Sequence, residues 1–76
     1  MVNTELARKC VKKSGKKYKY IAEKMGIAPY SLTKKIENKS PITTKEVNIF
    51  CKEVGITDKN LMCEIFFANR LDLKSN

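Results

Sequence analysis

Three polar residues between positions 30 and 34 have the side chains and the spacing needed to hydrogen-bond to nucleic-acid bases. Tyr30, Thr33 and Lys34 lie three to four positions apart, so they would share one face of a helix. Phenol, hydroxyl and ammonium groups on such a face can reach base edges in the major groove of DNA. The alternative interpretation is an ordinary solvated helix face, which needs no ligand.

Positive side chains flank this stretch and could bind phosphate groups. Lys17, Lys19 and Lys39 stand at expected helix ends and in the loop that follows. The start of another expected helix, near residue 43, could hold a further phosphate through its backbone N–H groups. The full set of candidate phosphate contacts is Lys17, Tyr18, Lys19, Ser31, Asn38, Lys39, Ser40, Thr43, Thr44 and Lys45.

The net charge of +8 is confined to the first half of the chain. Residues 1–39 contain eleven Lys or Arg and three Glu, whereas residues 40–76 contain five basic and five acidic residues. Such an excess indicates an anionic partner: nucleic acid, an acidic membrane or an acidic protein. Nucleic acid fits best because the charge surrounds the candidate base contacts. A separate basic run is interpreted as solvated surface: Arg8, Lys9, Lys12 and Lys13.

Five helices are expected to position these residues, which gives an all-α fold. The spacing of apolar residues predicts helices over about 4–14, 18–25 and 29–37. A fourth begins with the T-x-x-E capping box of Thr43 and Glu46 and stops at Gly55, and a short fifth begins at residue 57 or 58. The segment 65–73 could form a short edge strand at most. The expected inward residues are Leu6, Ala7, Cys10, Val11, Tyr18, Ile21, Ala22, Met25, Leu32, Ile36, Val47, Phe50, Cys51, Val54, Leu61 and Ile65.

Residues 18–39 predict two short helices joined by a tight turn. Ala22 is small enough to allow the two helices to cross closely, and Gly26 can adopt the positive φ that the turn needs. Pro29 suits a first helical position because its missing N–H costs nothing there. Asn38 is expected in a left-handed conformation where the chain leaves the second of these helices.

These stretches resemble the repressor and Cro superfamily of helix-turn-helix regulators, and more narrowly its short phage-encoded members. The resemblance covers about residues 4–68. It rests on Gly26-Ile27-Ala28, Leu32, Lys35-Ile36, Asn38-Lys39 and Ile65-Phe66-Phe67-Ala68. It implies a five-helix repressor-like bundle that binds a double-stranded DNA operator on paired half-sites. The implied function is that of a phage or prophage Cro-like repressor.

The chain departs from the family pattern at several positions. Ala28 and Lys17 stand where Ser or Thr commonly caps a helix, and Ala is a poor cap. Pro29 and Tyr30 occupy positions where the family commonly reads bases with Gln or Arg, so Pro29 joins the candidate base contacts. The inward residue after Leu32 is four positions on, at Ile36. These changes bear on the operator sequence more than on the fold.

The C-terminal part predicts a possible homodimer contact. Phe66 and Phe67 are adjacent, so they point about 100° apart on a helix. One can join Ile65 and Leu61 in the core, and the other can contact a second copy. The expected domain covers residues 1–68, followed by a polar tail over residues 69–76.

Composition argues against several other functions. The chain has no His, and its three Cys lack metal-ligand spacing and are expected to be buried, so no metal, cofactor, small-molecule substrate or enzyme activity is expected. No apolar run approaches the roughly 18 residues of a membrane span. The N-terminal segment lacks the apolar core of a signal peptide, which predicts a cytoplasmic location.

Two rival functions remain open from the sequence. The first is an antirepressor, or another protein-interaction module on the same fold, that binds a partner regulator without DNA. An apolar outer face on residues 29–37 would favour it. The second is non-specific or RNA binding, which lacks the interleaved aromatic residues of a stacking platform.

Overall fold

The computed structural model describes residues 1–67, and within this range it is all-helical. The helices are α1 (Thr4–Ser14), α2 (Tyr18–Met25), α3 (Pro29–Ile36), α4 (Thr44–Val54) and α5 (Lys59–Phe66). The predicted all-α class is therefore confirmed. Because α5 extends through Phe66, the edge strand considered from residue 65 is wrong for its first two residues. Ala68 and the expected tail over 69–76 lie outside the described residues.

Local sequence signals account for the helix boundaries. The side chains of Asn3, Thr43 and Asp58 each accept a hydrogen bond from a backbone N–H in the helix that follows. Thr43 forms the full capping box with Glu46, as the spacing predicts. Lys17 and Ala28 supply no side-chain cap. Helices α2 and α3 therefore depend on packing more than on capping.

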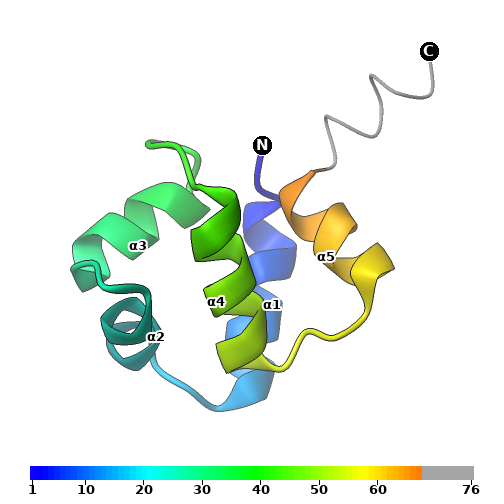
Figure 1. Ribbon diagram of the computed structural model, residues 1–76, viewed down its shortest axis with the longest axis horizontal. Coiled ribbons are helices and arrows are strands. Elements are labelled where there is room, and N and C mark those ends of the chain that lie inside the picture. Colours follow the sequence, from blue (N-terminus) through cyan, green and yellow to red (C-terminus); the bar gives the residue numbers. More distant parts are fainter. Residues whose placement is uncertain (68–76) are drawn as a thin grey trace.

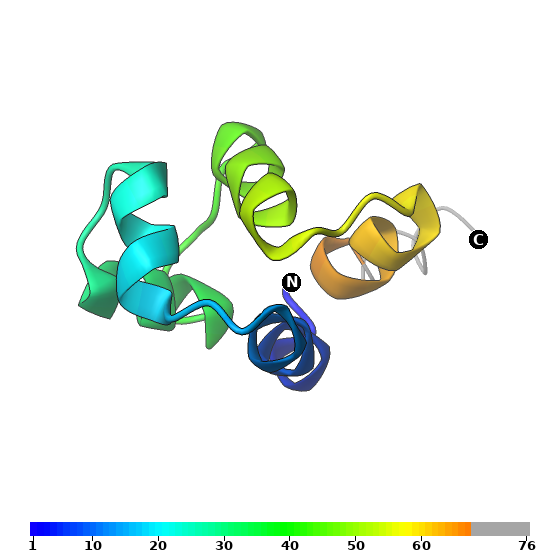
Figure 2. The ribbon, with the colours of Figure 1, turned by 90° about the horizontal axis from the view of Figure 1, so that it is seen from below.

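The helices surround one core. Helices α2 and α3 form one end of the molecule, α5 the other, and α1 and α4 lie between them (Figures 1 and 2). The rings of Phe50 and Phe66 meet edge to face in the core, with centroids 5.4 Å apart. Most expected inward residues are buried, whereas Leu6, Cys10, Tyr18 and Leu61 are partly buried. The sequence analysis did not identify Val2 and Ile56, which are also buried.

The turn between α2 and α3 is held by its own backbone. Gly26 adopts φ 75°, and its N–H donates to the carbonyl of Glu23. The next N–H, from Ile27, reaches back to the carbonyl of Ala22, whose side chain is fully buried at the helix contact. Both expectations for this turn, a small residue at the crossing and a glycine with positive φ, are confirmed.

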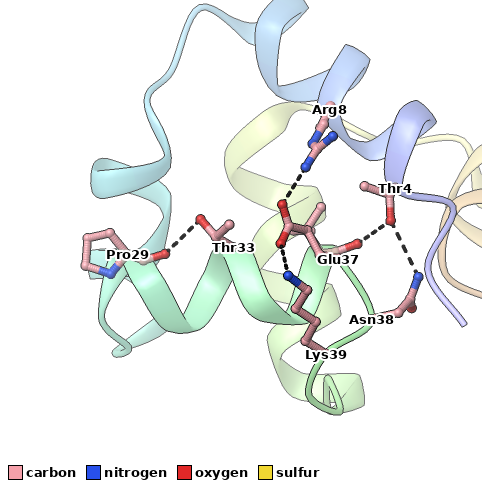
Figure 3. Close-up of polar contacts among 8 residues, drawn as sticks. Thr4, Arg8, Pro29, Thr33, Glu37, Asn38 and Lys39 are labelled. Atoms are coloured by element: carbon pink, nitrogen blue, oxygen red, sulfur yellow. Dashed lines mark hydrogen bonds and ion pairs between the residues drawn. The ribbon is translucent and has the colours of Figure 1, made fainter.

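Asn38 fastens the end of α3 to the N-terminal segment. It adopts φ 64°, as expected for the exit of the helix. Its Oδ1 accepts from the Val2 N–H at 2.7 Å, and its Nδ2 donates to the Val2 carbonyl at 2.8 Å. The Thr4 hydroxyl donates to the Ile36 carbonyl at 2.6 Å (Figure 3). The N–H of Asn3 donates to the Ile65 carbonyl, so residues 2–4 connect α3 with α5.

Replacing Asn38 should destabilise the fold through two separable contributions, its side-chain hydrogen bonds and its left-handed backbone. We expect Asn38→Ala to lower the free energy of unfolding by roughly 2–4 kcal/mol, from two hydrogen bonds and a left-handed backbone. Asn38→Gly keeps the backbone freedom and should lose about 1 kcal/mol less. Urea denaturation measures both variants, with Asn48→Ala on the exposed side of α4 as the control. Equal losses for Ala and Gly would contradict the backbone contribution.

Candidate nucleic-acid interface

The rotation of α3 is fixed by two buried side chains. Leu32 and Ile36 lie four positions apart and are both almost fully buried in the core. Tyr30 and Lys34 are also four apart, on the opposite side of the helix. Tyr30 is 73% exposed, and the Lys34 Nζ lies 5.5 Å from the centroid of its ring. The outer face of α3 therefore presents one phenol and one ammonium group side by side.

The other two candidate base contacts lie differently on α3. Pro29 is exposed at the first helical position. Thr33 is half-buried, and its hydroxyl donates to the Pro29 carbonyl at 3.2 Å (Figure 3). Thr33 also lines a cavity of about 150 Å³ beside Tyr18 and Arg8. Thr33 is thus turned toward α1 and α2, and its oxygen can accept a hydrogen bond but has already used its proton.

The start of α2 presents two lysines without ion pairs. Lys17 and Lys19 are exposed, and no ion pair within residues 1–67 involves either of them. Tyr18 between them is half-buried, and burial raises its pKa above the ordinary 10.0, with the nearby Arg8 guanidinium acting in the opposite direction. Its hydroxyl therefore keeps its proton at neutral pH and can donate a hydrogen bond.

The exit from α3 brings together charges that are far apart in the sequence. The Glu37 Oε2 accepts from the Arg8 Nη2 at 2.6 Å, and the Glu37 Oε1 lies 3.4 Å from the Lys39 Nζ (Figure 3). Arg8 was interpreted as solvated surface, but it spans from α1 to the end of α3. Lys39 keeps an exposed ammonium group, whereas the amide of Asn38 is already engaged by Val2.

Four further candidate phosphate contacts lie at the start of α4 and in the loop before it: Ser40, Thr43, Thr44 and Lys45. Ser40 is half-buried, and Thr44 and Lys45 are exposed in the first turn of α4. The capping box already uses the N–H groups of Thr43 and Glu46. The Glu46 carboxylate also lies 3.3 Å from the Lys35 Nζ. An anion at this helix start would find the N–H groups of residues 44 and 45, next to a carboxylate that is already in place.

Glu46 is the acidic group most clearly stabilised in its charged form. The hydrogen bond from the Thr43 backbone N–H lowers the pKa of Glu46 below its ordinary 4.5; burial opposes this, and Lys35 adds to it. Neither Lys35 nor Glu46 was among the candidate site residues. Their pairing could have been anticipated only from the packing of α3 against the start of α4.

The two phenylalanines near the C-terminus differ in burial. Phe66 is buried against Phe50, so it is the phenylalanine that joins the core, as expected of one of the two. Phe67 is half-buried at the end of α5, where its N–H donates to the Cys63 carbonyl. The possible dimer contact therefore rests on Phe67 alone.

The cysteines do not form a site within the described residues. Cys51 is buried as expected. Its burial, with a smaller contribution from the nearby Cys10, raises its pKa to about 11. Cys10 and Cys63 are only partly buried, contrary to the expectation. No group of three metal-ligating side chains occurs among residues 1–67. No helix among these residues is long and apolar enough to cross a membrane.

The sequence reasoning missed the Arg8–Glu37 pair and the Asn38–Val2 contact. They join residues 29 and 36 positions apart, and no short motif marks either contact. The sequence places Glu37 among lysines at the end of α3, which does not single out Arg8 as its partner. In comparisons with known proteins, no protein-family model, curated protein or solved structure matches this chain.

The capping box predicts a specific loss of stability in acid. A carboxyl whose folded pKa is depressed stabilises the protein above its unfolded pKa, near 4.5 for Glu46, and loses this contribution as pH falls through the folded pKa. We expect urea denaturation to show a smaller difference between pH 7 and pH 3 in Glu46→Gln than in the parent. Glu64→Gln, exposed on α5, is the control. An unchanged difference in Glu46→Gln would contradict the assignment.

Proposed function

We propose that this protein is a sequence-specific, double-stranded DNA-binding regulator. Helices α2 and α3 act as a helix-turn-helix, and α3 enters the major groove. The observation that carries the proposal is the outward pair of Tyr30 and Lys34 on a helix whose opposite side is locked into the core. In keeping with the family resemblance, we propose a Cro-like repressor of phage or prophage origin.

The charge distribution supports this proposal. The whole +8 lies on residues 1–39, which form α1, α2, α3 and their connections. Lys17 and Lys19 at the start of α2 are exposed and carry no ion pair among residues 1–67, so they are available for phosphate groups. Contacts of this kind hold a duplex in register, while the residues on α3 distinguish its bases.

A second copy of the chain completes the proposal. Dimeric helix-turn-helix proteins place two reading helices about one helical turn of DNA apart, on half-sites related by two-fold symmetry. We place the contact between copies at half-buried Phe67, which follows the last residue of α5.

A partner protein in place of DNA is the second candidate function. Its supporting observation is also Tyr30, because an aromatic side chain 73% exposed is typical of an anchor in a protein interface. Such an antirepressor would use the same face of α3 to bind a regulator. The concentration of positive charge around this face favours the duplex. A partner protein would need an acidic surface to match it.

Salt dependence tests the DNA-binding proposal. If each subunit contacts about four to five phosphates, a dimer should show a log–log slope of affinity against salt of roughly −7 to −9. The measurement is a gel-shift titration of the duplex that flanks the protein's own gene. A slope near zero for a bound duplex would refute binding through the basic face. Absence of binding to any duplex at low salt would favour the antirepressor.

Lys34 should behave differently from Lys17 on matched duplexes. We expect Lys34→Ala to cost about 1–3 kcal/mol on the specific site and to relax preference at one or two base pairs. Lys17→Ala should instead weaken specific and scrambled duplexes alike and reduce the salt slope by about one per subunit.

Lys24→Ala is the matched control for this comparison. Lys24 lies 5.4 Å from the ring of Tyr20 on α2, a contact of the same kind as Lys34 on Tyr30. Lys24→Ala should change the preference for bases little. If Lys34→Ala lowers the affinity for both duplexes equally, Lys34 is a phosphate contact and the reading face is misassigned.

A further inference from the structure

Glu37 forms ion pairs with two cations, Arg8 and Lys39, at the edge of the proposed DNA interface. One carboxylate oxygen accepts from the Arg8 Nη2 at 2.6 Å, and the other lies 3.4 Å from the Lys39 Nζ (Figure 3). Both oxygens are therefore directed at positive groups. The Glu37 side chain is 27% exposed and that of Lys39 is 68% exposed. A duplex phosphate could thus reach Lys39 directly but would approach the carboxylate at the same time.

We propose that Glu37 is a built-in competitor of DNA phosphate for Lys39. This inference rests on the proposed function and concerns how tightly the same interface binds. In the free protein the carboxylate holds Lys39; on a duplex, a phosphate takes its place. Glu37 thereby lowers the affinity for every sequence, since it acts on the phosphate grip and makes no base contact.

The unequal strength of the two contacts supports this order of events. Lys39 is mostly exposed, and exposed pairs of this kind are weak, so a phosphate can displace the carboxylate from Lys39 easily. The Arg8 contact is shorter and holds the carboxylate in place. The Glu37 carboxylate therefore stays at the interface when Lys39 contacts the DNA. There it repels the phosphate that Lys39 binds.

Other cations of the basic half have no comparable competitor near α3. Within residues 1–67, Lys17 and Lys19 are in no ion pair, and Lys16 pairs with Glu53 of α4. Lys35 pairs with Glu46, which is part of the capping box. The Lys35 Nζ also donates to the Pro41 carbonyl at 2.7 Å. Lys35 is thus committed to the fold, and Lys39 is the paired cation that a phosphate can recruit.

The test compares Glu37→Gln with Glu53→Gln on specific and scrambled duplexes. Both variants remove one negative charge. Glu37→Gln frees Lys39, at 3.4 Å, and Arg8, at 2.6 Å, whereas Glu53→Gln frees Lys16, at 3.5 Å. We expect Glu37→Gln to bind both duplexes roughly two- to fivefold tighter per subunit than Glu53→Gln. Its salt slope should stay close to that of the parent, because Lys39 contacts a phosphate in both proteins. Binding no tighter than Glu53→Gln would overturn the proposal.

A second pair of variants separates the release of Lys39 from a general change in charge or folding. In a Lys39→Ala background the gain from Glu37→Gln should disappear, because the two residues act through one contact. The double variant Arg8→Gln/Glu37→Gln leaves the net charge at +8 and strands no unpaired charge if Glu37→Gln alone fails to fold. This double variant should still bind both duplexes more tightly than the parent. A gain that persists without Lys39 would overturn the proposal.

The outcomes also separate this inference from the proposed function. If neither the parent nor any variant binds duplex DNA at low salt, the DNA-binding function fails and the inference fails with it. If the parent binds with the steep salt slope expected of a basic interface but Glu37→Gln binds no more tightly, only the role of Glu37 is wrong.

Discussion

The burial of Leu32 and Ile36 is the constraint on which the candidate interface depends. Because both side chains are almost fully enclosed, α3 can neither rotate nor slide without opening the core. The direction of Tyr30 and Lys34 follows from this, since they lie on the other side of the same helix. Ala22 on α2 is fully buried, and its small side chain permits α2 to pack closely against α3. The candidate interface on α3 is held by packing, because Ala28 provides no side-chain cap.

The ends of α3 are held by different interactions. At its start, the backbone turn through Gly26 sets the direction of entry. At its end, Asn38 binds both backbone groups of Val2, and the neighbouring N–H of Asn3 reaches the Ile65 carbonyl. The N-terminal residues therefore belong to the fold of the interface as much as the helices do. Truncating them would loosen the exit from α3 and its connection to α5.

The electrostatics of the basic half are less uniform than its net charge suggests. Arg8 and Lys39 meet Glu37, Lys35 meets Glu46, and Lys16 meets Glu53, so that several cations are partly neutralised inside the protein. Among the described residues, Lys17 and Lys19 at the start of α2 are exposed and have no ion pair. Affinity for the proposed anionic partner would then depend on which lysines are free of a carboxylate and on how readily the others exchange it.

The sequence by itself determined the features that depend on neighbours within four residues. The helix boundaries, the capping box at Thr43, the turn at Gly26 and the left-handed Asn38 were all predictable because their hydrogen bonds close over short segments. Only the tertiary structure decided which of Phe66 and Phe67 is buried, that Val2 belongs to the core, and that Arg8 reaches Glu37. These contacts join residues about sixteen to thirty-six positions apart, and helical periodicity sets which face a side chain occupies but not which distant element packs against it.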